Sequence, residues 1–194
     1  MPKSEVRPSD ADVMEQSDPV TIRPVTAVDV DPLAALQEAS ILRLGLAPYG
    51  AAKVRAWARV GHEFKHVLLE EGRYFVAERA GERVGVGGWS PDSLEAELAW
   101  IRYLFVHPDH VRCGIGRRLV EVAERAAAAA GRPRFEVWSS LNAEPFYTAL
   151  GYRRVRAARW PVAAEIALDY VLMGKPAARP DTGSGPRAAS LSPG

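Results

Sequence analysis

The chain has 194 residues, of which 47% are hydrophobic and 25% are charged. This length and composition fit one folded domain with short extensions and exclude a disordered or fibrous chain. The 25 lysines and arginines nearly balance the 24 aspartates and glutamates, so the net charge of +1 gives no overall attraction to nucleic acid or to an anionic membrane.

The two ends of the chain differ in composition from the middle. Residues 1–18 are polar and show no hydrophobic period, and 14 of the 20 residues from 175 to 194 are Ala, Gly, Pro or Ser. Segments of this composition bury too little apolar surface to offset the entropy that ordering would cost. We therefore expect disordered tails over 1–18 and 176–194 and one domain over 19–175.

Strand-like and helix-like hydrophobic patterns follow one another within that domain. Runs rich in β-branched and aromatic residues, ended by proline or glycine, predict strands. Apolar residues three to five positions apart, as at 33, 36, 41 and 44, predict helices. The expected strands cover 20–25, 73–78, 83–89, 98–107, 134–138, 152–159 and 166–173, and the expected helices cover 29–44, 51–60, 115–130 and 143–150. Mixed elements with one strand–loop–helix–strand unit in the middle indicate an α/β layer architecture.

The most informative stretch joins the strand over 98–107 to the helix that follows it. It reads Val106-His107-Pro108-Asp109-His110-Val111-Arg112-Cys113-Gly114-Ile115-Gly116-Arg117-Arg118. Glycines let successive backbone N–H groups curl around an anion, and a helix start adds unpaired N–H groups and the positive end of a dipole. The three arginines add positive charge, so the loop indicates a phosphate site. The alternative is a helix start whose glycines permit close packing and whose arginines face solvent.

A second segment, Asn142-Ala143-Glu144-Pro145-Phe146-Tyr147-Thr148-Ala149-Leu150-Gly151-Tyr152, lies one strand further on. Together with the loop it resembles the GNAT family, the GCN5-related N-acetyltransferases. The family hallmarks are an apolar-x-apolar strand end, an Arg/Gln-x-x-Gly-x-Gly/Ala loop and an Asn…Phe-Tyr…Leu-Gly-Tyr/Phe stretch, which match 104–106, 111–116 and 142–152. The resemblance covers nearly all of 19–175. It implies the GNAT fold: a mixed, mostly antiparallel twisted sheet of six to seven strands, flanked by about four helices.

The resemblance also implies acetyl-coenzyme A as the cosubstrate. Its pyrophosphate would lie on the amides of the loop residues Arg112, Cys113, Gly114, Ile115, Gly116 and Arg117. Its pantetheine arm would lie on the preceding strand, at Leu104, Phe105 and Val106. The side chain of Asn142 would contact the cofactor near the same cleft. An acceptor amine would attack the thioester directly while the Tyr147 phenol protonates the departing thiolate. The alternative for Tyr147 is a core aromatic beside Phe146. By the same resemblance, Tyr49, Trp57, Trp89 and Arg102 are candidates for the acceptor side.

Two positions depart from the family pattern. The Arg/Gln that opens the loop is Val111 here, and because backbone amides hold the phosphates, we expect binding to survive. Where some members carry a base glutamate on the strand, this sequence has Trp100. The nearest carboxylate, Glu97, falls on the opposite face of a regular strand. Glu97 and Glu95 are therefore only candidates for the catalytic base, which the sequence leaves unassigned, with a water chain to solvent as the alternative.

The segment His62-Glu63-Phe64-Lys65-His66 matches the H-E-x-x-H pattern of zinc proteases. On a helix, two imidazoles would share one face with a glutamate as base. Gly61 and Gly72 leave room for only a short helix, and no third ligand accompanies the motif. We therefore keep a zinc hydrolase only as a remote alternative and expect no metal.

The sequence thus predicts an acetyl-CoA-dependent N-acetyltransferase, with a non-catalytic acyl-CoA sensor of the same fold as the alternative. The expected partner is a small-molecule or peptide amine, with neither nucleic acid nor membrane, and a homodimer would agree with the family. Cys113 is the only cysteine, which excludes an internal disulfide and favours a reducing compartment. No apolar run approaches 18 residues, and Met1–Glu5 lack the layout of a signal peptide. We expect a cytoplasmic protein.

Overall fold

The computed structural model describes residues 18–60, 64–69 and 72–176. Its strands are β1 (Thr21–Pro24), β2 (Tyr74–Arg79), β3 (Glu82–Pro91), β4 (Leu98–Val106), β5 (Arg134–Ser140), β6 (Arg153–Ala163) and β7 (Ile166–Lys175). Its α-helices are α1 (Val30–Leu44), α2 (Leu46–Val60), α3 (Phe64–Val67), α4 (Ile115–Ala129) and α5 (Glu144–Ala149). Short 3-10 turns, η1 (Ala27–Asp29) and η3 (Pro108–His110), precede α1 and follow β4.

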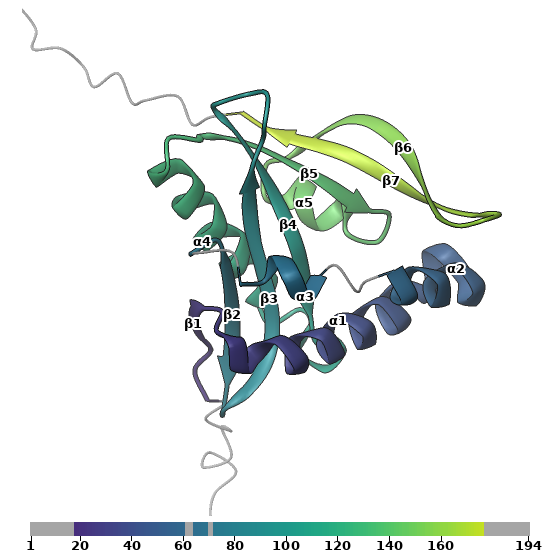
Figure 1. Cartoon of the computed structure of the whole chain (residues 1–194), viewed down its shortest axis with the longest axis horizontal. Helices are drawn as coiled ribbons and strands as arrows, with labels where there is room; N and C mark the ends of the chain where they lie inside the picture. Colours follow the sequence, from purple (N-terminus) through teal and green to yellow (C-terminus); the bar gives the residue numbers. More distant parts are fainter. Residues whose placement is uncertain (1–17, 61–63, 70–71, 177–194) are drawn as a thin grey trace, which may run out of the picture.

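All seven strands form one open sheet in the order β1-β2-β3-β4-β5-β7-β6 (Figure 1). Every neighbouring pair is antiparallel except β4 and β5, which run parallel. The parallel pair is joined by the crossover through α4, as a parallel connection requires. The predicted mixed, mostly antiparallel sheet is therefore confirmed, with seven strands.

Helices cover both faces of this sheet. The α4 face holds the main core, in which Ile115, Leu119 and Ala123 of α4 pack against strand residues such as Ile101 and Val137. The α5 helix lies on the same face, since its Tyr147 belongs to this core.

On the other face, two smaller clusters join the remaining helices to the sheet. Leu33 and Leu36 of α1 pack with Val76 of β2, and Ile41 and Val54 pack with β7. Helices α1 and α4 bury the apolar stripes that their sequence periods predicted.

Two local features differ from the sequence expectation. Helix α2 starts at Leu46 rather than at 51, but Gly50 (φ 77°, ψ 163°) interrupts it, so the regular part begins close to the predicted residue. The four-residue helix α3 was not predicted. Its segment packs Leu68 beneath α1, so a tertiary contact supports a turn whose polar sequence gives little signal.

A buried carboxylate ties β1 to α1. Asp29 is fully buried and accepts hydrogen bonds from Arg23 (2.7 and 2.9 Å) and from Arg83 Nε (2.9 Å). It also accepts from the Thr26 backbone N–H and hydroxyl. These hydrogen bonds, led by that from Arg23, hold the pKa of the Asp29 carboxyl far below its usual range.

Among the described residues, no helix combines the length and the apolar character needed to cross a membrane.

Candidate active site

The parallel ladder between β4 and β5 is short and ends early. It comprises three pairs, Leu98 with Arg134, Ala99 with Phe135 and Trp100 with Glu136. Beyond Trp100 the two strands diverge, while β4 continues to Val106 and β5 to Ser140. The backbone of β4 after Trp100 therefore turns its β5-facing N–H and C=O groups toward the space between the strands.

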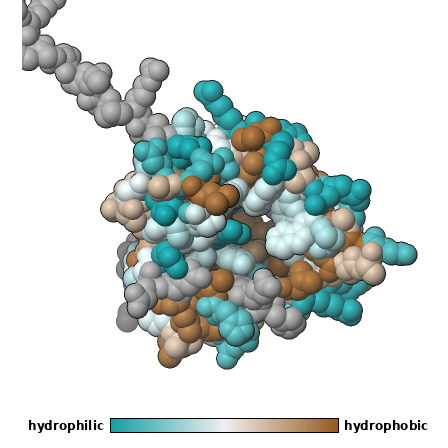
Figure 2. All heavy atoms as spheres, turned by 45° about the horizontal axis from the view of Figure 1, so that its top comes forward, coloured by the Kyte–Doolittle hydropathy of each residue, from teal (hydrophilic) through white to brown (hydrophobic). Residues whose placement is uncertain are grey.

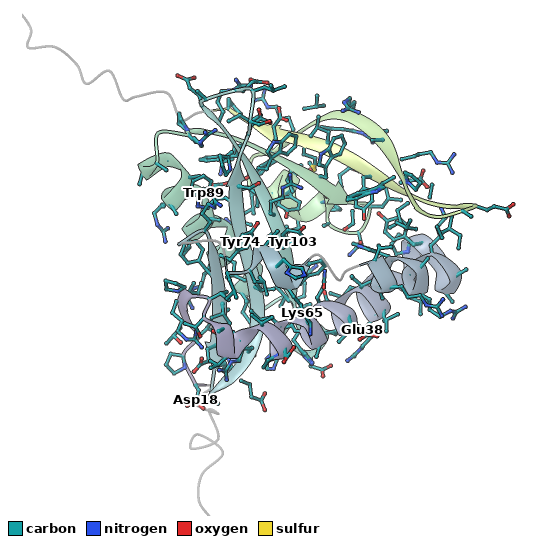
Figure 3. All side chains as sticks on the ribbon, viewed as in Figure 1. Asp18, Glu38, Lys65, Tyr74, Trp89 and Tyr103 are labelled. Atoms are coloured by element: carbon teal, nitrogen blue, oxygen red, sulfur yellow. The ribbon has the colours of Figure 1, made fainter. Side chains whose placement is uncertain are left out.

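A β-bulge reshapes β4 in this diverging region. Tyr103 has a left-handed backbone (φ 53°), and β4 gains one residue opposite Gly87 of β3. Figure 3 shows Tyr103 beside Tyr74 of β2. Their ring centroids are 6.0 Å apart. Bulges re-aim side chains next to functional sites, and here the bulge moves Leu104 to the α4 face and Phe105 to the α1 face.

Residues 107–117 lead from β4 into the first turn of α4, and we name them the phosphate loop after the site that their sequence predicts. His107 anchors its start, because the backbone N–H donates to Val84 (2.9 Å) and Nδ1 accepts from the Asp109 N–H (3.3 Å). Arg112 (φ 66°) and Gly114 (φ 77°) are both left-handed. No side chain caps α4 at Gly114, so the first N–H groups of the helix are open to a ligand.

A cavity of about 730 Å³ joins this loop to the space beside β4. Four parts of the chain form its wall: the end of β4, the phosphate loop with the start of α4, the β5–α5 connection with α5, and the α1–α2 corner. The lining residues include Leu104, Phe105, Val106, Arg112, Gly114, Ile115, Gly116, Arg117, Ser140, Asn142, Phe146, Ser40, Ile41 and Trp57. Figure 2 shows that the molecule is hollowed near the middle of the displayed face, with hydrophobic and weakly polar side chains around the hollow.

The structure brings nine of the ten predicted cofactor-binding residues to this one cavity. They are Leu104, Phe105, Val106, Arg112, Gly114, Ile115, Gly116, Arg117 and Asn142. Cys113 is the exception: its side chain is exposed, and the Sγ lies 3.5 Å from the Val111 carbonyl oxygen. Any role of Cys113 therefore falls to its backbone rather than to its thiol.

Tyr147 lies in the core next to the cavity rather than on its wall. The side chain is 4% exposed and packs edge-on against Phe146 and Tyr152, with ring centroids 5.0 and 5.3 Å away. Its neighbour Phe146 lines the cavity. Burial, and next the charge of Glu124, raise the pKa of the Tyr147 phenol well above its usual range. The phenol is thus protonated at every working pH, and its role as proton donor stays a prediction.

Glu97 lies outside the cavity. It occupies the turn before β4 and is exposed. Because β4 begins only at Leu98 and the cavity lies at the other end of the strand, Glu97 is remote from the residues that the fold gathers. This placement gives no support to Glu97 as the base.

The acceptor-side candidates have separate positions. Trp57 lines the cavity. The Tyr49 hydroxyl donates to the Asp169 carbonyl (2.7 Å) and accepts from the Leu141 N–H (2.9 Å), so it fastens α2 to the sheet. Trp89 lies in the α4-face core, and Arg102 stacks on the ring of Trp100 at 5.7 Å.

The H-E-x-x-H motif lies partly outside the described residues, since His62 and Glu63 do. His66 belongs to the short helix α3. Within 18–60, 64–69 and 72–176, no group of three or more His, Cys, Asp or Glu is arranged to hold a metal ion.

Comparison with known proteins places this geometry in context. A family model described as an acetyltransferase (GNAT) domain matches residues 70–154. An uncharacterised N-acetyltransferase of Methanocaldococcus jannaschii is 32% identical over 140 residues, which is 68% of this chain and 60% of that protein. The chain thus spans less than two thirds of that relative's length.

Solved structures show the same fold. A GCN5-related N-acetyltransferase from Rhodopseudomonas palustris superposes with a TM-score of 0.71 at 27% identity, covering 82% of this chain and 97% of that one. The PaiA N-acetyltransferase of Thermoplasma acidophilum, solved in complex with coenzyme A, gives a TM-score of 0.66 at 15% identity, covering 81% and 99%.

Proposed function

Because the chain belongs to the GNAT acetyltransferase family, we propose that residues 19–175 form an N-acetyltransferase that moves an acetyl group from acetyl-CoA to a primary amine. The single observation that carries the proposal is the cavity, which joins the phosphate loop to the diverging part of β4. One end of this cavity suits an anion, and the other presents a strand edge along which an amide-bearing chain can lie.

The phosphate end fits the pyrophosphate of coenzyme A. Arg112 and Gly114 curve the backbone so that N–H groups converge, and the uncapped start of α4 adds its dipole. Arg117 lines the cavity, and its ion pair with Glu121 on the helix surface is long, at 3.9 Å. Val111 in place of the family's Arg/Gln therefore leaves the backbone cradle intact.

The strand end fits the pantetheine arm. Backbone groups of β4 between Leu104 and Val106 face the cavity where β5 has diverged. The two amides of pantetheine would pair with them as a neighbouring strand does. Gly116 lets the Phe146 ring of the cavity wall pack close to α4, because a β-carbon there would lie 3.3 Å from that ring.

In the proposed reaction, the amine nitrogen attacks the thioester carbonyl carbon, the C–N bond forms and the C–S bond breaks. The thiolate takes a proton, for which the Tyr147 phenol is the proposed source, and the proton released by the amine nitrogen restores the phenol. No covalent enzyme intermediate is needed, so the absence of an activated nucleophile among the cavity-lining residues agrees with direct transfer.

Two measurements test this function. Calorimetric titration with coenzyme A should show binding, and thiol release from acetyl-CoA with a panel of amino acids, polyamines and peptides should show amine-dependent turnover. Tight binding without turnover on any amine would favour the acyl-CoA sensor. Absence of binding would contradict both functions.

A further inference from the structure

A half-buried carboxylate on β5, Glu136, lies where β4 and β5 separate. It pairs with Trp100 in the last step of the parallel ladder. Its strand position places it on the same sheet face as Trp138 and Ser140, two and four residues on. Ser140 lines the cavity, so this face of β5 leads from the cavity to Glu136.

Aromatic rings lie on this face of the sheet between Glu136 and the cavity. Trp100 and Trp138 stack in parallel, with centroids 6.2 Å apart and planes 6° apart. Trp138 packs against the same cluster as Trp57, which lines the cavity. The Trp100 ring is fixed because its Nε1 donates to Asp92 (2.8 Å). The two stacked rings thus lie beside the cavity rather than in its wall, to which Ser140 of β5 and Trp57 of α2 belong.

Glu136 differs from the other carboxylates near it. Glu95 is paired with Arg134 (2.7 Å), and Asp92 accepts from the Trp100 indole and two backbone N–H groups. Within the described ranges 18–60, 64–69 and 72–176, no hydrogen bond or ion pair occupies the Glu136 carboxylate. A partly buried carboxylate that no hydrogen bond or ion pair occupies is available to take a proton.

The charges that face Glu136 come from three elements. Arg134 is on β5 itself, Asp92 and Glu95 are in the β3–β4 connection, and Arg156 of β6 stacks over Trp138 at 4.8 Å. Burial dominates and raises the pKa of the Glu136 carboxyl, the two acids add to the rise, and the two arginines oppose it.

We propose that Glu136 is the general base of the acetyl transfer, accepting a proton from an acceptor amine bound on the Trp100–Trp138 surface. The inference rests on the proposed function. The acceptor arrives as an ammonium ion, and Glu136 takes one proton, directly or through one water. The neutral nitrogen then attacks the thioester carbon and the C–S bond breaks. A second proton from nitrogen ends on the thiol, and Glu136 returns its proton to solvent.

The test compares pH profiles of kcat/KM for the primary amine that the wild type acetylates fastest. For the wild type, kcat/KM should rise as the pH passes through the pKa of Glu136 and should then level off below the pKa of the amine. In Glu136→Gln, kcat/KM at pH 7 should fall about 100-fold. The remaining kcat/KM should rise tenfold per pH unit up to the pKa of the free amine. Glu136→Asp should retain the plateau at a lower rate.

Matched measurements separate a chemical role from a structural one. Coenzyme A affinity and melting temperature should stay close to wild type in Glu136→Gln, and Glu38→Gln, on the exposed side of α1, should leave the profile unchanged. A Glu136→Gln profile with the wild-type shape, whatever its height, would overturn the proposal. A Glu136→Asp profile in which kcat/KM rises tenfold per pH unit up to the pKa of the free amine would also overturn it. If the wild type shows no amine-dependent turnover, the proposed function itself fails, a result distinct from either of these.

Discussion

Arg112 and Gly114 share a left-handed backbone conformation, with φ angles of 66° and 77°, on either side of Cys113. Only glycine adopts this conformation without cost, so Arg112 carries strain that the loop must offset. Two such residues so close together turn the backbone N–H groups to one side, at the start of α4. The local strain is thus located where the proposed phosphate site lies.

Replacing Gly114 by alanine should weaken coenzyme A binding about tenfold or more. A β-carbon there meets no atom within 4 Å, so the cost comes from the backbone alone, about 1–2 kcal/mol. Gly131→Ala is the matched control, because Gly131 (φ 80°) lies just beyond the other end of α4 and is equally open. Both variants should lose similar stability on urea unfolding, but only Gly114→Ala should lose affinity in calorimetry. Equal affinities would contradict a role for the loop backbone.

Arg117→Ala should raise the dissociation constant of coenzyme A about 10-fold and flatten its dependence on salt. The side chain lines the cavity, and a charge-assisted bond to a phosphate contributes about 1.5–3 kcal/mol. Its contact with Glu121 is long and half-exposed, so stability should barely change. Arg125→Ala, on the exposed side of the same helix, should leave both quantities unchanged. If the two variants bind equally well, Arg117 faces solvent rather than ligand.

Tyr147→Phe distinguishes proton donation from packing. As proton donor, Tyr147 supports catalysis only through its hydroxyl, so the variant should lose about 100-fold in kcat and keep its affinity for coenzyme A. Steady-state kinetics and calorimetry measure the two effects. Unchanged kcat would assign Tyr147 to the core that it shares with Phe146 and Tyr152.

Asp29→Asn should destabilise the fold by about 2–4 kcal/mol at pH 7. Breaking a buried ion pair costs roughly 3–5 kcal/mol, and here Arg23 and Arg83 remain partly exposed, which moderates the loss. The pKa of Asp29 is lower in the folded state than in the unfolded state. The ionised carboxylate therefore adds to the free energy of unfolding above the unfolded-state pKa of Asp29, and this contribution is lost as the pH falls from there through the folded-state pKa.

The matching measurement is urea unfolding of both proteins between pH 7 and pH 2. The difference in unfolding free energy should shrink steadily from about pH 5 downward. A difference that is independent of pH would show that packing rather than charge is responsible.

The sequence predicts most of the fold because local and global signals agree along β2 to β5. Alternating apolar residues, the turn at Gly81 and the glycines before α4 each specify one local structure. Helix α3 could not be predicted, because its support comes from the packing of the adjacent Leu68 against α1, a distant part of the chain. Pairings such as Arg43 with Asp109 (2.8 Å), which joins α1 to the phosphate loop, also depend on tertiary structure alone.

The sequence predicts those parts of the candidate site whose residues form a continuous motif. It does not predict the parts that come together only when the strands pair in the sheet. The loop and Asn142 share the cavity as expected. Glu97 is the nearest carboxylate to Trp100 along the chain, but Glu136 lies opposite Trp100 across the ladder. Strand register brought these two together, and one sequence alone does not fix the register between strands that a helix separates.

The sheet has its weakest seam at this same ladder. Three residue pairs join β4 to β5, whereas nine join β6 to β7 and six join β3 to β4. Separating the half-sheet β1–β4 from the half-sheet β5–β7 therefore breaks fewer backbone hydrogen bonds than separation at any other line through the sheet. Opening motions should divide the molecule there, with the amide protons that pair β4 with β5 exchanging before those that pair β6 with β7. The β4–β5 ladder, which has the fewest residue pairs in the sheet, would thus also border the path by which the substrates enter.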